Sequence, residues 1–330
     1  MKLYDTRWCA NHGIGRFSKE ILSFSPPETI SGRFDDIFSP FDPIRLLAKC
    51  LLNNSWYISP SYNCPLFWHR KSIITIHDLM HINFPEYAGL KNKIYYEYLV
   101  KPVCEKSPLI FTVSEYTKNE IVQWCGVDPE KIVVVYNGVD DKYHVNVKPY
   151  KHVRPYLFYV GDKKMHKNIY RLLSAYKKSD AMNSHDLILS GSENDEIIKW
   201  VNELDIAQKV KFSGFIPEND LPGYYKGATA LVFPSLYEGF GLPIIEAMAV
   251  GTPVLTSNVT SMPEIAGNAA WLVDPKDISD ISNGINVLVT ENSVRSKLIE
   301  KGLERATMFN WERSREIWNS SIEAVVGAKN

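Results

Sequence analysis

The sequence predicts an α/β protein built from two Rossmann-like domains, each with a doubly wound parallel sheet. Three observations lead to this prediction. Short runs that are apolar throughout alternate with helical patterns, which is typical of parallel sheets covered on both faces. These runs form two series, separated by a polar stretch with two prolines at residues 140–155. The length of 330 residues suits two domains of ordinary size.

The apolar runs predict strands in both halves of the chain. These runs cover residues 72–79, 109–115 and 131–139 in the first series, and 156–162, 186–191, 209–215, 228–235 and 251–257 in the second. We therefore divide the chain into domains of residues 1–150 and 151–308. The remaining segment, 309–330, predicts an amphipathic helix that returns to the first domain, with Trp311 and Trp318 two turns apart on one face.

Charge and composition argue against several classes of protein. The 37 basic and 38 acidic side chains leave a formal net charge of -1, which disfavours a nucleic-acid-binding protein. We find no secretory signal and no apolar run of the ~18 residues that a membrane-spanning helix needs, so we expect a cytoplasmic protein. The five cysteines are odd in number and include no C-x-x-C pair, so we expect reduced, mostly buried thiols.

Polar side chains follow three of the predicted strands, at residues 77–78, 161–167 and 238–246. In open α/β sheets, ligands bind beyond the carboxyl ends of the strands. These three segments are therefore the candidates for a binding site.

The segment PSLYEGFGLPIIEAMAVGTPV, residues 234–254, predicts a helix with an open amino end. Pro243 suits the first helical position, and Gly251 suits a left-handed cap at the other end. The N-cap then falls on Leu242, which has no side-chain acceptor for the first N–H groups. Gly241 lets another molecule approach this backbone closely, and such a helix start favours a phosphate.

Two interpretations of this helix start remain open. In the first, its N–H groups bond water and Glu246 only complements the helix dipole. In the second, it binds a diphosphate together with the lysines at the end of another predicted strand, which are Lys163, Lys164 and Lys167. Lysines alone are more often a solvated face, but lysines and an open helix start in one domain favour the second interpretation.

Glu238 and Glu246 lie on either side of this helix start. A carboxylate can accept two hydrogen bonds from a vicinal diol. Two carboxylates that flank a diphosphate could therefore hold a ribose and a second sugar, and the pattern predicts a site for a nucleotide sugar.

The same segment resembles the E-x7-E motif of retaining glycosyltransferases of family 4, whose GT-B fold has two Rossmann-like domains facing a cleft. Here the motif reads EGFGLPIIE, from Glu238 to Glu246. Other segments resemble the family in the same order along the chain: NHGIGRFSKEI (11–21), ITIHDLMHINFPEY (74–87), TVSEYTKNEI (112–121), VVYNGVD (134–140), YVGDKKMHKN (159–168) and SMPEIAGNAAWLVDP (261–275). The resemblance spans nearly the whole chain.

The resemblance implies roles for residues of the second domain, which would bind the nucleotide sugar. Glu238 would bind hydroxyls of the donor sugar, and Glu246 would bind the ribose diol. Lys163 and Lys167 would hold the diphosphate and stabilise the charge that develops there. Phe240, Gly241 and Leu242 would offer backbone amides, and Gly161 would let the donor approach closely. The base would rest against the turn of Phe215 and Ile216.

The resemblance also implies roles in the first domain, which would bind the acceptor. Gly13 and Gly15 would let a loop approach the donor phosphates, and His77 would face the sugar. Each role has a plainer alternative. The two glycines can simply shape a tight turn, and His77 can close its strand end against Asp78.

The implied reaction transfers a hexose from a nucleoside diphosphate to an acceptor hydroxyl with retention of the anomeric configuration. We expect no cofactor and no metal, because the lysines and a helix dipole would supply the positive charge. The sequence also has no D-x-D cluster. The departing phosphate would accept the acceptor's proton.

Basic and aromatic residues mix in two segments of the first domain, LKNKIYYEYLVKPV (90–103) and CPLFWHRK (64–71). In one interpretation they form a peripheral contact with the inner membrane, and the acceptor is a glycan linked to undecaprenyl diphosphate. In the other they form a buried aromatic helix with solvated lysines.

The resemblance extends to bacterial mannosyltransferases that build the O-antigen of lipopolysaccharide, which implies GDP-mannose as the donor. Three alternatives stay open. The same fold could use a UDP- or dTDP-sugar, it could bind a nucleotide sugar without catalysis, or it could belong to an epimerase or phosphorylase.

Overall fold

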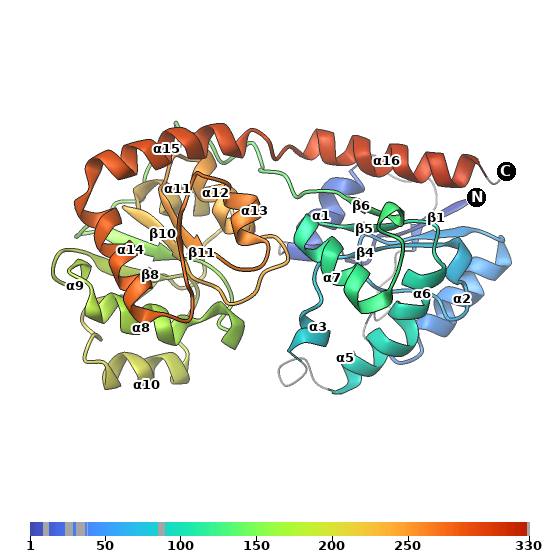
Figure 1. Cartoon of the computed structure of the whole chain (residues 1–330), viewed down its shortest axis with the longest axis horizontal. Helices are drawn as coiled ribbons and strands as arrows, with labels where there is room; N and C mark the ends of the chain where they lie inside the picture. The colour runs from blue at the N-terminus through green and yellow to red at the C-terminus, as the bar shows by residue number, and fades with distance from the viewer. Residues whose placement is uncertain (9–12, 24–28, 31–36, 38, 85–89, 329–330) are drawn as a thin grey trace. The chain divides into compact units, whose positions relative to one another are not determined.

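Figure 1 shows the computed structural model of the chain, which describes all residues except 9–12, 24–28, 31–36, 38, 85–89 and 329–330. The chain forms two compact units. The first contains Met1–Gly138 and Asn310–Asn330, and the second contains Val139–Phe309. Each unit holds a six-stranded sheet whose paired strands are all parallel. The predicted α/β class with two parallel sheets is confirmed.

The sheet of the first unit has the strand order β2-β1-β3-β4-β5-β6. Its strands are β1 (Lys2–Asp5), β2 (Thr29–Ile30), β3 (Trp56–Ile58), β4 (Ser72–Ile76), β5 (Ile110–Thr112) and β6 (Ile132–Val134). Its helices are α1 (Gly13–Ile21), α2 (Asp42–Leu52), α3 (Met80–Asn83), α5 (Leu90–Tyr95), the π-helical turn η2 (Tyr96–Val100), α6 (Lys101–Lys106), α7 (Glu115–Cys125) and α16 (Trp311–Gly327), with short 3-10 turns η1 (His69–Lys71) and η3 (Pro129–Lys131).

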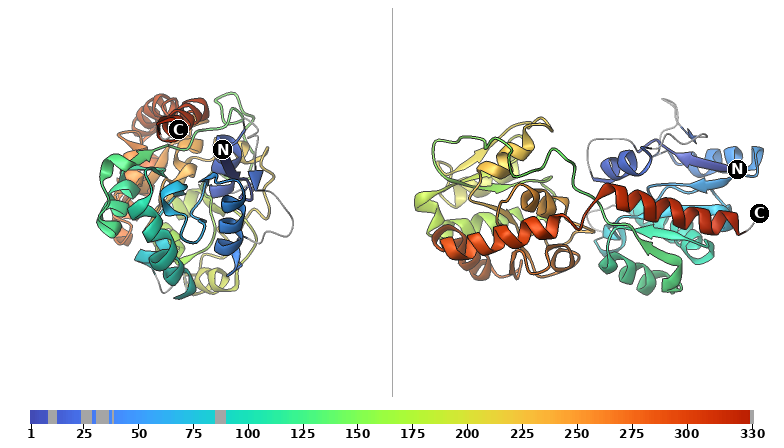
Figure 2. Two further views of the ribbon diagram at one scale, coloured as in Figure 1. Left: turned by 90° about the vertical axis from the view of Figure 1, so that its right-hand side faces the viewer. Right: turned by 90° about the horizontal axis from the view of Figure 1, so that it is seen from above.

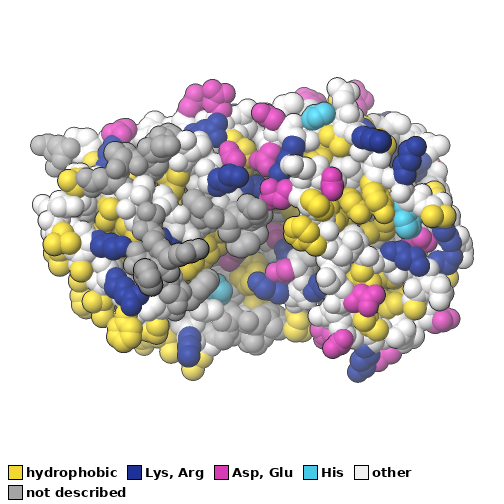
Figure 3. All heavy atoms as spheres, turned by 180° about the vertical axis from the view of Figure 1, so that it is seen from behind, with side chains coloured by type: hydrophobic (Ala, Val, Ile, Leu, Met, Phe, Trp, Pro, Cys, Tyr) yellow, Lys and Arg dark blue, Asp and Glu magenta, His cyan; other side chains and the backbone are white. Residues whose placement is uncertain are grey.

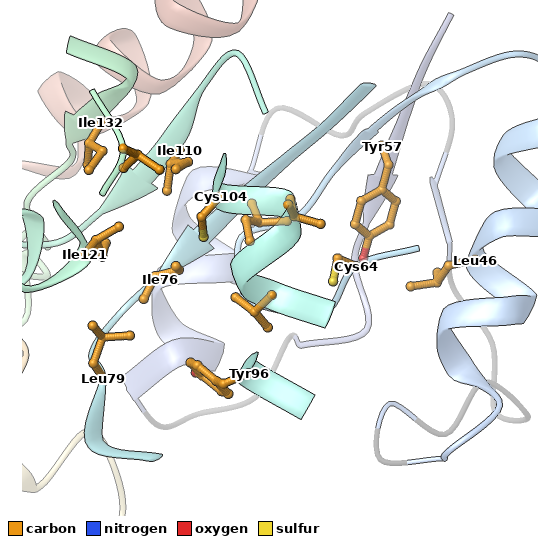
Figure 4. Close-up of a cluster of buried hydrophobic side chains, with 14 of the residues drawn as sticks. Leu46, Tyr57, Cys64, Ile76, Leu79, Tyr96, Cys104, Ile110, Ile121 and Ile132 are labelled. Carbon is orange, nitrogen blue, oxygen red and sulfur yellow. The ribbon is translucent and has the colours of Figure 1, made fainter. Parts of the chain in front are cut away.

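A cluster of buried side chains packs between this sheet and its helices (Figure 4). Tyr57, Ile76 and Ile110 come from three neighbouring strands and are fully buried. Cys64 and Cys104 lie in the same cluster as free thiols, and burial raises the pKa of Cys64 to about 12. Across the described residues, no group of His, Cys, Asp and Glu side chains is arranged to hold a metal ion.

Helix α16 packs on the first unit although it follows the second unit in the sequence (Figures 1 and 2). The side chain of Asn310 caps its first turn. Trp318 stacks on Phe111 of β5 with ring centres 4.0 Å apart and also meets the ring of Phe17. Trp311 and Trp318 are both buried, as expected for two residues on the apolar face of an amphipathic helix.

The sheet of the second unit has the strand order β12-β11-β10-β7-β8-β9. Its strands are β7 (Tyr156–Tyr159), β8 (Asp186–Leu189), β9 (Val210–Phe212), β10 (Ala230–Phe233), β11 (Val254–Ser257) and β12 (Trp271–Val273). Its helices are α8 (Ile169–Lys178), α9 (Ala181–Ser184), α10 (Asp195–Glu203), α11 (Leu221–Gly227), α12 (Leu242–Ala249), α13 (Met262–Ala266), α14 (Ile278–Thr290) and α15 (Asn292–Ala306), with the 3-10 turn η4 (Met165–Lys167). The strand order reverses between β7 and β10.

The connection between the units joins the second unit earlier than the boundary that we placed after residue 150. The first unit ends at Gly138. Tyr150 stacks on Tyr224 of α11 with ring centres 4.0 Å apart, and its N–H donates to the carbonyl of Gly223. These contacts explain why residues that look like a polar linker in the sequence pack on the second unit.

Candidate active site

The loops that follow β7 and β10 meet at the point where the strand order of the second unit reverses. Such a switch point is where open α/β sheets bind ligands. Asn168 joins the loops, because its side-chain amide donates to the carbonyls of Pro234 at 2.9 Å and Pro275 at 2.6 Å. The N–H of Leu236 donates to the carbonyl of His166 at 2.7 Å. The fold thus brings together the two segments that the sequence singles out in this domain.

The loop after β7 needs two unusual backbone conformations. Gly161 has φ 145°, and a Cβ atom there would lie 3.2 Å from the hydroxyl of Tyr159. Asn168 has φ 62°, a left-handed conformation that asparagine tolerates better than most residues. No role was predicted for Asn168, which is the last residue of the segment YVGDKKMHKN (159–168).

Lys167 and Glu238 form an ion pair between these loops. The Lys167 ammonium lies 2.7 Å from the Glu238 carboxylate, and the two side chains are 14% and 12% exposed. The ammonium also lies 5.5 Å from the ring centre of Phe233, at the end of β10. Two residues that the sequence analysis assigns to different parts of one ligand are therefore direct partners.

The other predicted diphosphate ligand, Lys163, lies toward the opposite side of β7. Its ammonium donates to the carbonyl of Ser192 after β8 and lies 4.9 Å from the ring centre of Phe212 in β9. Burial lowers the pKa of Lys163, and Glu193 opposes that shift. Lys163 and Lys167 thus bracket the end of β7 and have separate partners.

Two hydroxyl residues after β11 hold the backbone around Glu238. Ser261 donates to the carbonyls of Glu238 at 2.8 Å and Phe240 at 3.1 Å, and Thr260 accepts from the N–H of Glu238 at 3.3 Å. The ring of Phe240 is buried against Phe309, so only its backbone can serve a ligand. Neither Thr260 nor Ser261 was predicted to act at the site, although both follow a predicted strand and Ser261 begins the segment 261–275 that resembles the family.

Helix α12 starts one residue earlier than predicted. It begins at Leu242, and its N-cap is Gly241 with φ 95°, so the expected N-cap at Leu242 is wrong. A glycine adopts this left-handed conformation readily, which moves Pro243 to the second helical position. Among the residues that the structure describes, no side chain caps this helix start. The predicted left-handed glycine at the far end is confirmed, with φ 77° at Gly251.

Glu246 lies in the interior, in the second turn of α12. It is 4% exposed, and its carboxylate accepts a hydrogen bond from the hydroxyl of Tyr225 in α11 at 2.7 Å. This contact holds the carboxylate between two helices rather than at the helix start. Sequence reasoning missed Tyr225, because nothing in the sequence links it to Glu246.

The turn after β9, predicted to meet the nucleotide base, presents an aromatic ring to solvent. Phe215 is 86% exposed, and Ile216 is half-buried. Gly214 and Gly191 exchange backbone hydrogen bonds, which ties this turn to the loop after β8. An exposed ring on a fixed turn has a free face for stacking.

His77 follows β4 directly in the first unit. Its Nε2 lies 2.8 Å from the carbonyl of Pro60, and its ring meets Phe17 edge-on. Burial lowers the pKa of His77, so the ring is neutral and Nε2–H donates to Pro60. This tautomer leaves Nδ1 as an acceptor. The Asp78 carboxylate instead accepts from the N–H of Met80.

Gly13 and Gly15 lie in the first turn of α1, so our expectation of a glycine loop at these two positions is wrong. Gly13 is exposed, and a Cβ atom there would meet nothing within 4 Å. Neither glycine has the left-handed backbone of a tight turn. Gly13 therefore places no side chain at the first position of this helix.

Comparison with known proteins identifies the family. Residues 52–143 match the family described as Glycosyltransferase Family 4, and residues 143–305 match Glycosyl transferases group 1. O-antigen chain mannosyltransferase B of Escherichia coli is 33% identical over 272 residues, which cover 78% of this chain and 71% of that protein. O-antigen chain mannosyltransferase RfbU of Salmonella typhimurium is 32% identical over 244 residues, which cover 73% and 66%.

Two solved structures show the same fold at low sequence identity. WaaG, a glycosyltransferase involved in lipopolysaccharide biosynthesis, aligns over 99% of this chain and all of its own, with a TM-score of 0.77 and 12% identity. Anabaena Alr3699/HepE in complex with UDP and glucose aligns over 98% and 99%, with a TM-score of 0.77 and 16% identity. The chain is therefore a glycosyltransferase that belongs to family 4 and has the GT-B fold.

Proposed function

We propose that this enzyme is a retaining mannosyltransferase of bacterial surface-polysaccharide synthesis, with GDP-mannose as donor and a glycan hydroxyl as acceptor. The observation that carries the proposal is the similarity to two O-antigen mannosyltransferases, 33% and 32% identical, over most of the chain. The paired loops of the second unit support a donor site at that end of its sheet.

The donor diphosphate would lie between Lys163 and Lys167, beside the uncapped start of α12. Charge grows on the diphosphate as the glycosidic bond breaks, so fixed positive groups there stabilise the transition state more than the ground state. These groups would replace a divalent metal. Glu238 would accept hydrogen bonds from the sugar hydroxyls, and Glu246 would meet the ribose near Tyr225.

In the transfer step, the bond between the anomeric carbon and the diphosphate oxygen breaks. The bond between that carbon and the acceptor oxygen forms on the same face, and the acceptor's proton leaves with the diphosphate. His77 would assist as a neutral acceptor for a sugar hydroxyl, since its Nε2–H is engaged by Pro60.

Thermal unfolding with GDP, UDP, ADP and dTDP, and then with their sugars, tests the donor. A ligand at 100 times its dissociation constant adds about 2.7 kcal/mol to the stability of the folded protein. We expect GDP and GDP-mannose to give this shift with and without metal. A shift with UDP or dTDP alone would overturn the choice of GDP-mannose. Binding of GDP-mannose without sugar transfer to any polyprenyl-diphosphate glycan would favour a non-catalytic binding protein.

We further infer that the acceptor is linked to undecaprenyl diphosphate and that the first unit contacts the cytoplasmic membrane surface peripherally. Leu90, Ile94 and Tyr98 are 72%, 48% and 75% exposed and recur at four-residue spacing along α5 and η2. Lys91 and Lys93 are exposed beside them. Exposed apolar and basic side chains on one helix suit an anionic lipid surface.

The alternative of a buried aromatic helix accounts for Tyr96, which is 3% exposed, but not for the exposed residues of α5. No helix in the described part of the chain is long and apolar enough to cross a membrane. On the coloured part of the face in Figure 3, Lys and Arg side chains are interspersed with Asp and Glu. The coloured part of this face therefore has no basic stripe of the kind that binds nucleic acid.

Flotation with vesicles of phosphatidylglycerol and phosphatidylcholine tests the membrane contact. We expect binding at low salt that weakens as salt rises. The double variant Leu90→Ser, Ile94→Ser should lose most of it. Val153→Ser, which changes a residue 98% exposed in the second unit, is the matched control and should bind like the wild type. Absence of wild-type binding at low salt would overturn the inference.

A further inference from the structure

The Lys167–Glu238 ion pair joins two residues for which the proposed function names different ligand groups. Lys167 would hold the diphosphate, and Glu238 would hold the sugar. The two charged groups are 2.7 Å apart and mostly shielded from water, so their attraction is stronger than that of a surface pair. Lys167 therefore competes with the sugar for Glu238, and Glu238 competes with the diphosphate for Lys167.

Both members of the pair are held in place by their surroundings. The ring of Phe233 lies against the Lys167 ammonium, and Lys167 closes the turn η4 with an N–H bond to Lys164. Thr260 and Ser261 hold the backbone on both sides of the Glu238 side chain. A bound ligand would therefore replace the hydrogen bond between Lys167 and Glu238 without moving their backbones apart.

We propose that Lys167 and Glu238 form an exchange pair that makes the donor site favour the nucleotide sugar over the nucleoside diphosphate left after transfer. This inference rests on the proposed function. Sugar hydroxyls that donate to Glu238 replace the hydrogen bond from Lys167 and leave the ammonium free for the diphosphate. The sugar and the diphosphate thus assist each other in binding.

After transfer, the sugar leaves on the acceptor and the pair returns to its original state. Glu238 regains Lys167 as its partner, which reduces the positive charge available to the diphosphate. The Glu238 carboxylate also repels the diphosphate, because no sugar lies between them. Both effects favour release of the product, a step that limits the rate of many enzymes.

The variant Glu238→Gln tests the pair, because it keeps the size of the side chain and removes its charge. Isothermal titration calorimetry with GDP and GDP-mannose gives both dissociation constants. We expect GDP to bind about three- to tenfold more tightly than to the wild type, as removal of one nearby negative charge predicts. GDP-mannose should bind no more tightly, since its hydroxyls lose a charged acceptor.

The matched control is Glu203→Gln, which removes one carboxylate from the exposed Lys199–Glu203 pair on α10. It should leave both dissociation constants unchanged. The double variant Lys167→Gln, Glu238→Gln should lose the gain in GDP affinity, because that gain requires the freed ammonium. If Glu238→Gln does not fold, Glu238→Asp draws the carboxylate back and should give a smaller gain of the same sign.

Unchanged or weaker GDP binding in folded Glu238→Gln would overturn the exchange pair, and so would equal weakening of GDP and GDP-mannose. The failure of the proposed donor looks different. In that case the wild type binds another nucleotide instead of GDP, and the same comparison made with that nucleotide decides on the pair. A wild type that binds no nucleoside diphosphate and no nucleotide sugar would overturn both.

Discussion

Each unit has paired charged side chains at the point where its strand order reverses. We call the set in the first unit a closed network, because its members are buried and bonded to one another, and the pair in the second unit an open pair, because its members are partly exposed. In the first unit, Arg7 donates hydrogen bonds from its guanidinium to Asp5, at the end of β1, and to Asp42, at the start of α2. The side chains of Arg7, Asp5 and Asp42 are 4%, 0% and 2% exposed. In the second unit, Lys167 and Glu238 share one short contact and remain partly open.

The remaining acceptors of the first network are also occupied. The hydroxyl of Tyr57 donates to Asp5 at 2.7 Å, and the amide of Asn63 donates to Asp42 at 3.2 Å. Burial opposes the charge of Arg7, but the hydrogen bonds to Asp5 and Asp42 outweigh it and raise its pKa above the usual value. Charged residues at a switch point are therefore not all site residues. The spare hydrogen-bonding capacity of the second network is what a ligand can use.

Breaking the closed network should give the largest effect. Arg7→Met leaves Asp5 and Asp42 buried without their cation, so we expect a loss of about 3–5 kcal/mol of unfolding free energy. Urea denaturation measures it. Arg45→Met, which changes an exposed residue of α2, is the control and should stay within about 0.5 kcal/mol of the wild type. A loss below about 1 kcal/mol for Arg7→Met would mean that the network does not support the fold.

Breaking the open pair should affect the reaction more than the fold. Lys167→Ala removes a charge next to the proposed leaving group, so we expect kcat/KM to fall about 10²- to 10³-fold. The unfolding free energy should fall less than in Arg7→Met, by about 1–3 kcal/mol, because Glu238 loses its cation but is 12% exposed and not fully buried. Steady-state kinetics and urea denaturation give the two numbers.

Lys164→Ala is the matched control. The sequence suggested Lys164 as a third diphosphate lysine, but the structure leaves its side chain 68% exposed and pairs its ammonium with Asp162 of the same loop at 3.3 Å. Its kinetics should match the wild type within about twofold. An equal loss of activity in both variants would show that the loop as a whole, rather than the Lys167 charge, matters.

The sequence predicts some strands and site residues better than others. Strands β4 and β10 are buried at every position, so their apolar runs identify them. The edge strand β12 lies in a short apolar run, residues 269–273, but was not among the predicted strands, and two of its three positions are half-buried or exposed. Local patterns also identify the loop lysines and Glu238, because ligand-binding residues follow apolar strands directly.

The partners of those residues could not be predicted, because they come from distant parts of the chain. Tyr225 contacts Glu246 from another helix. Asp42 contacts Arg7 from a position 35 residues further along the chain, and no sequence pattern links the two. The predicted loop at Gly13 and Gly15 was wrong for a related reason. A G-x-G pattern is compatible with a turn or with a helix start, and only the tertiary structure decides.

Loss of the contact between Tyr225 and Glu246 should lower the unfolding free energy less than loss of the first network, because it is a single buried hydrogen bond. Tyr225→Phe removes the hydroxyl that donates to Glu246, and the carboxylate loses a buried hydrogen bond. We expect a loss of about 1–2 kcal/mol of unfolding free energy. If Glu246 meets the ribose, KM for the donor should rise and kcat should change little, because the carboxylate is no longer oriented. A change in stability without any change in KM would assign Glu246 to the fold alone.

The smallest expected effect comes from His166, which lies in the loop of the open pair but is itself 3% exposed. Its Nδ1 has no hydrogen-bond partner in the described part of the structure. Burial lowers the pKa of His166, and the charge of Lys167 lowers it further. Unfolding returns the imidazole to its ordinary pKa of about 6.5, so the unfolded chain binds more protons below that pH.

Stability should therefore be constant above about pH 6.5 and fall as the pH drops below it, by at most about 1.4 kcal/mol per pH unit for one such histidine. Burial also lowers the pKa of His77 and His185, so the wild type carries several such contributions. Urea denaturation of His166→Gln between pH 5 and 8 should show a shallower decline than the wild type. An unchanged slope would mean that folding does not lower the pKa of His166, so that the ring takes up a proton over the same pH range in the folded and the unfolded protein.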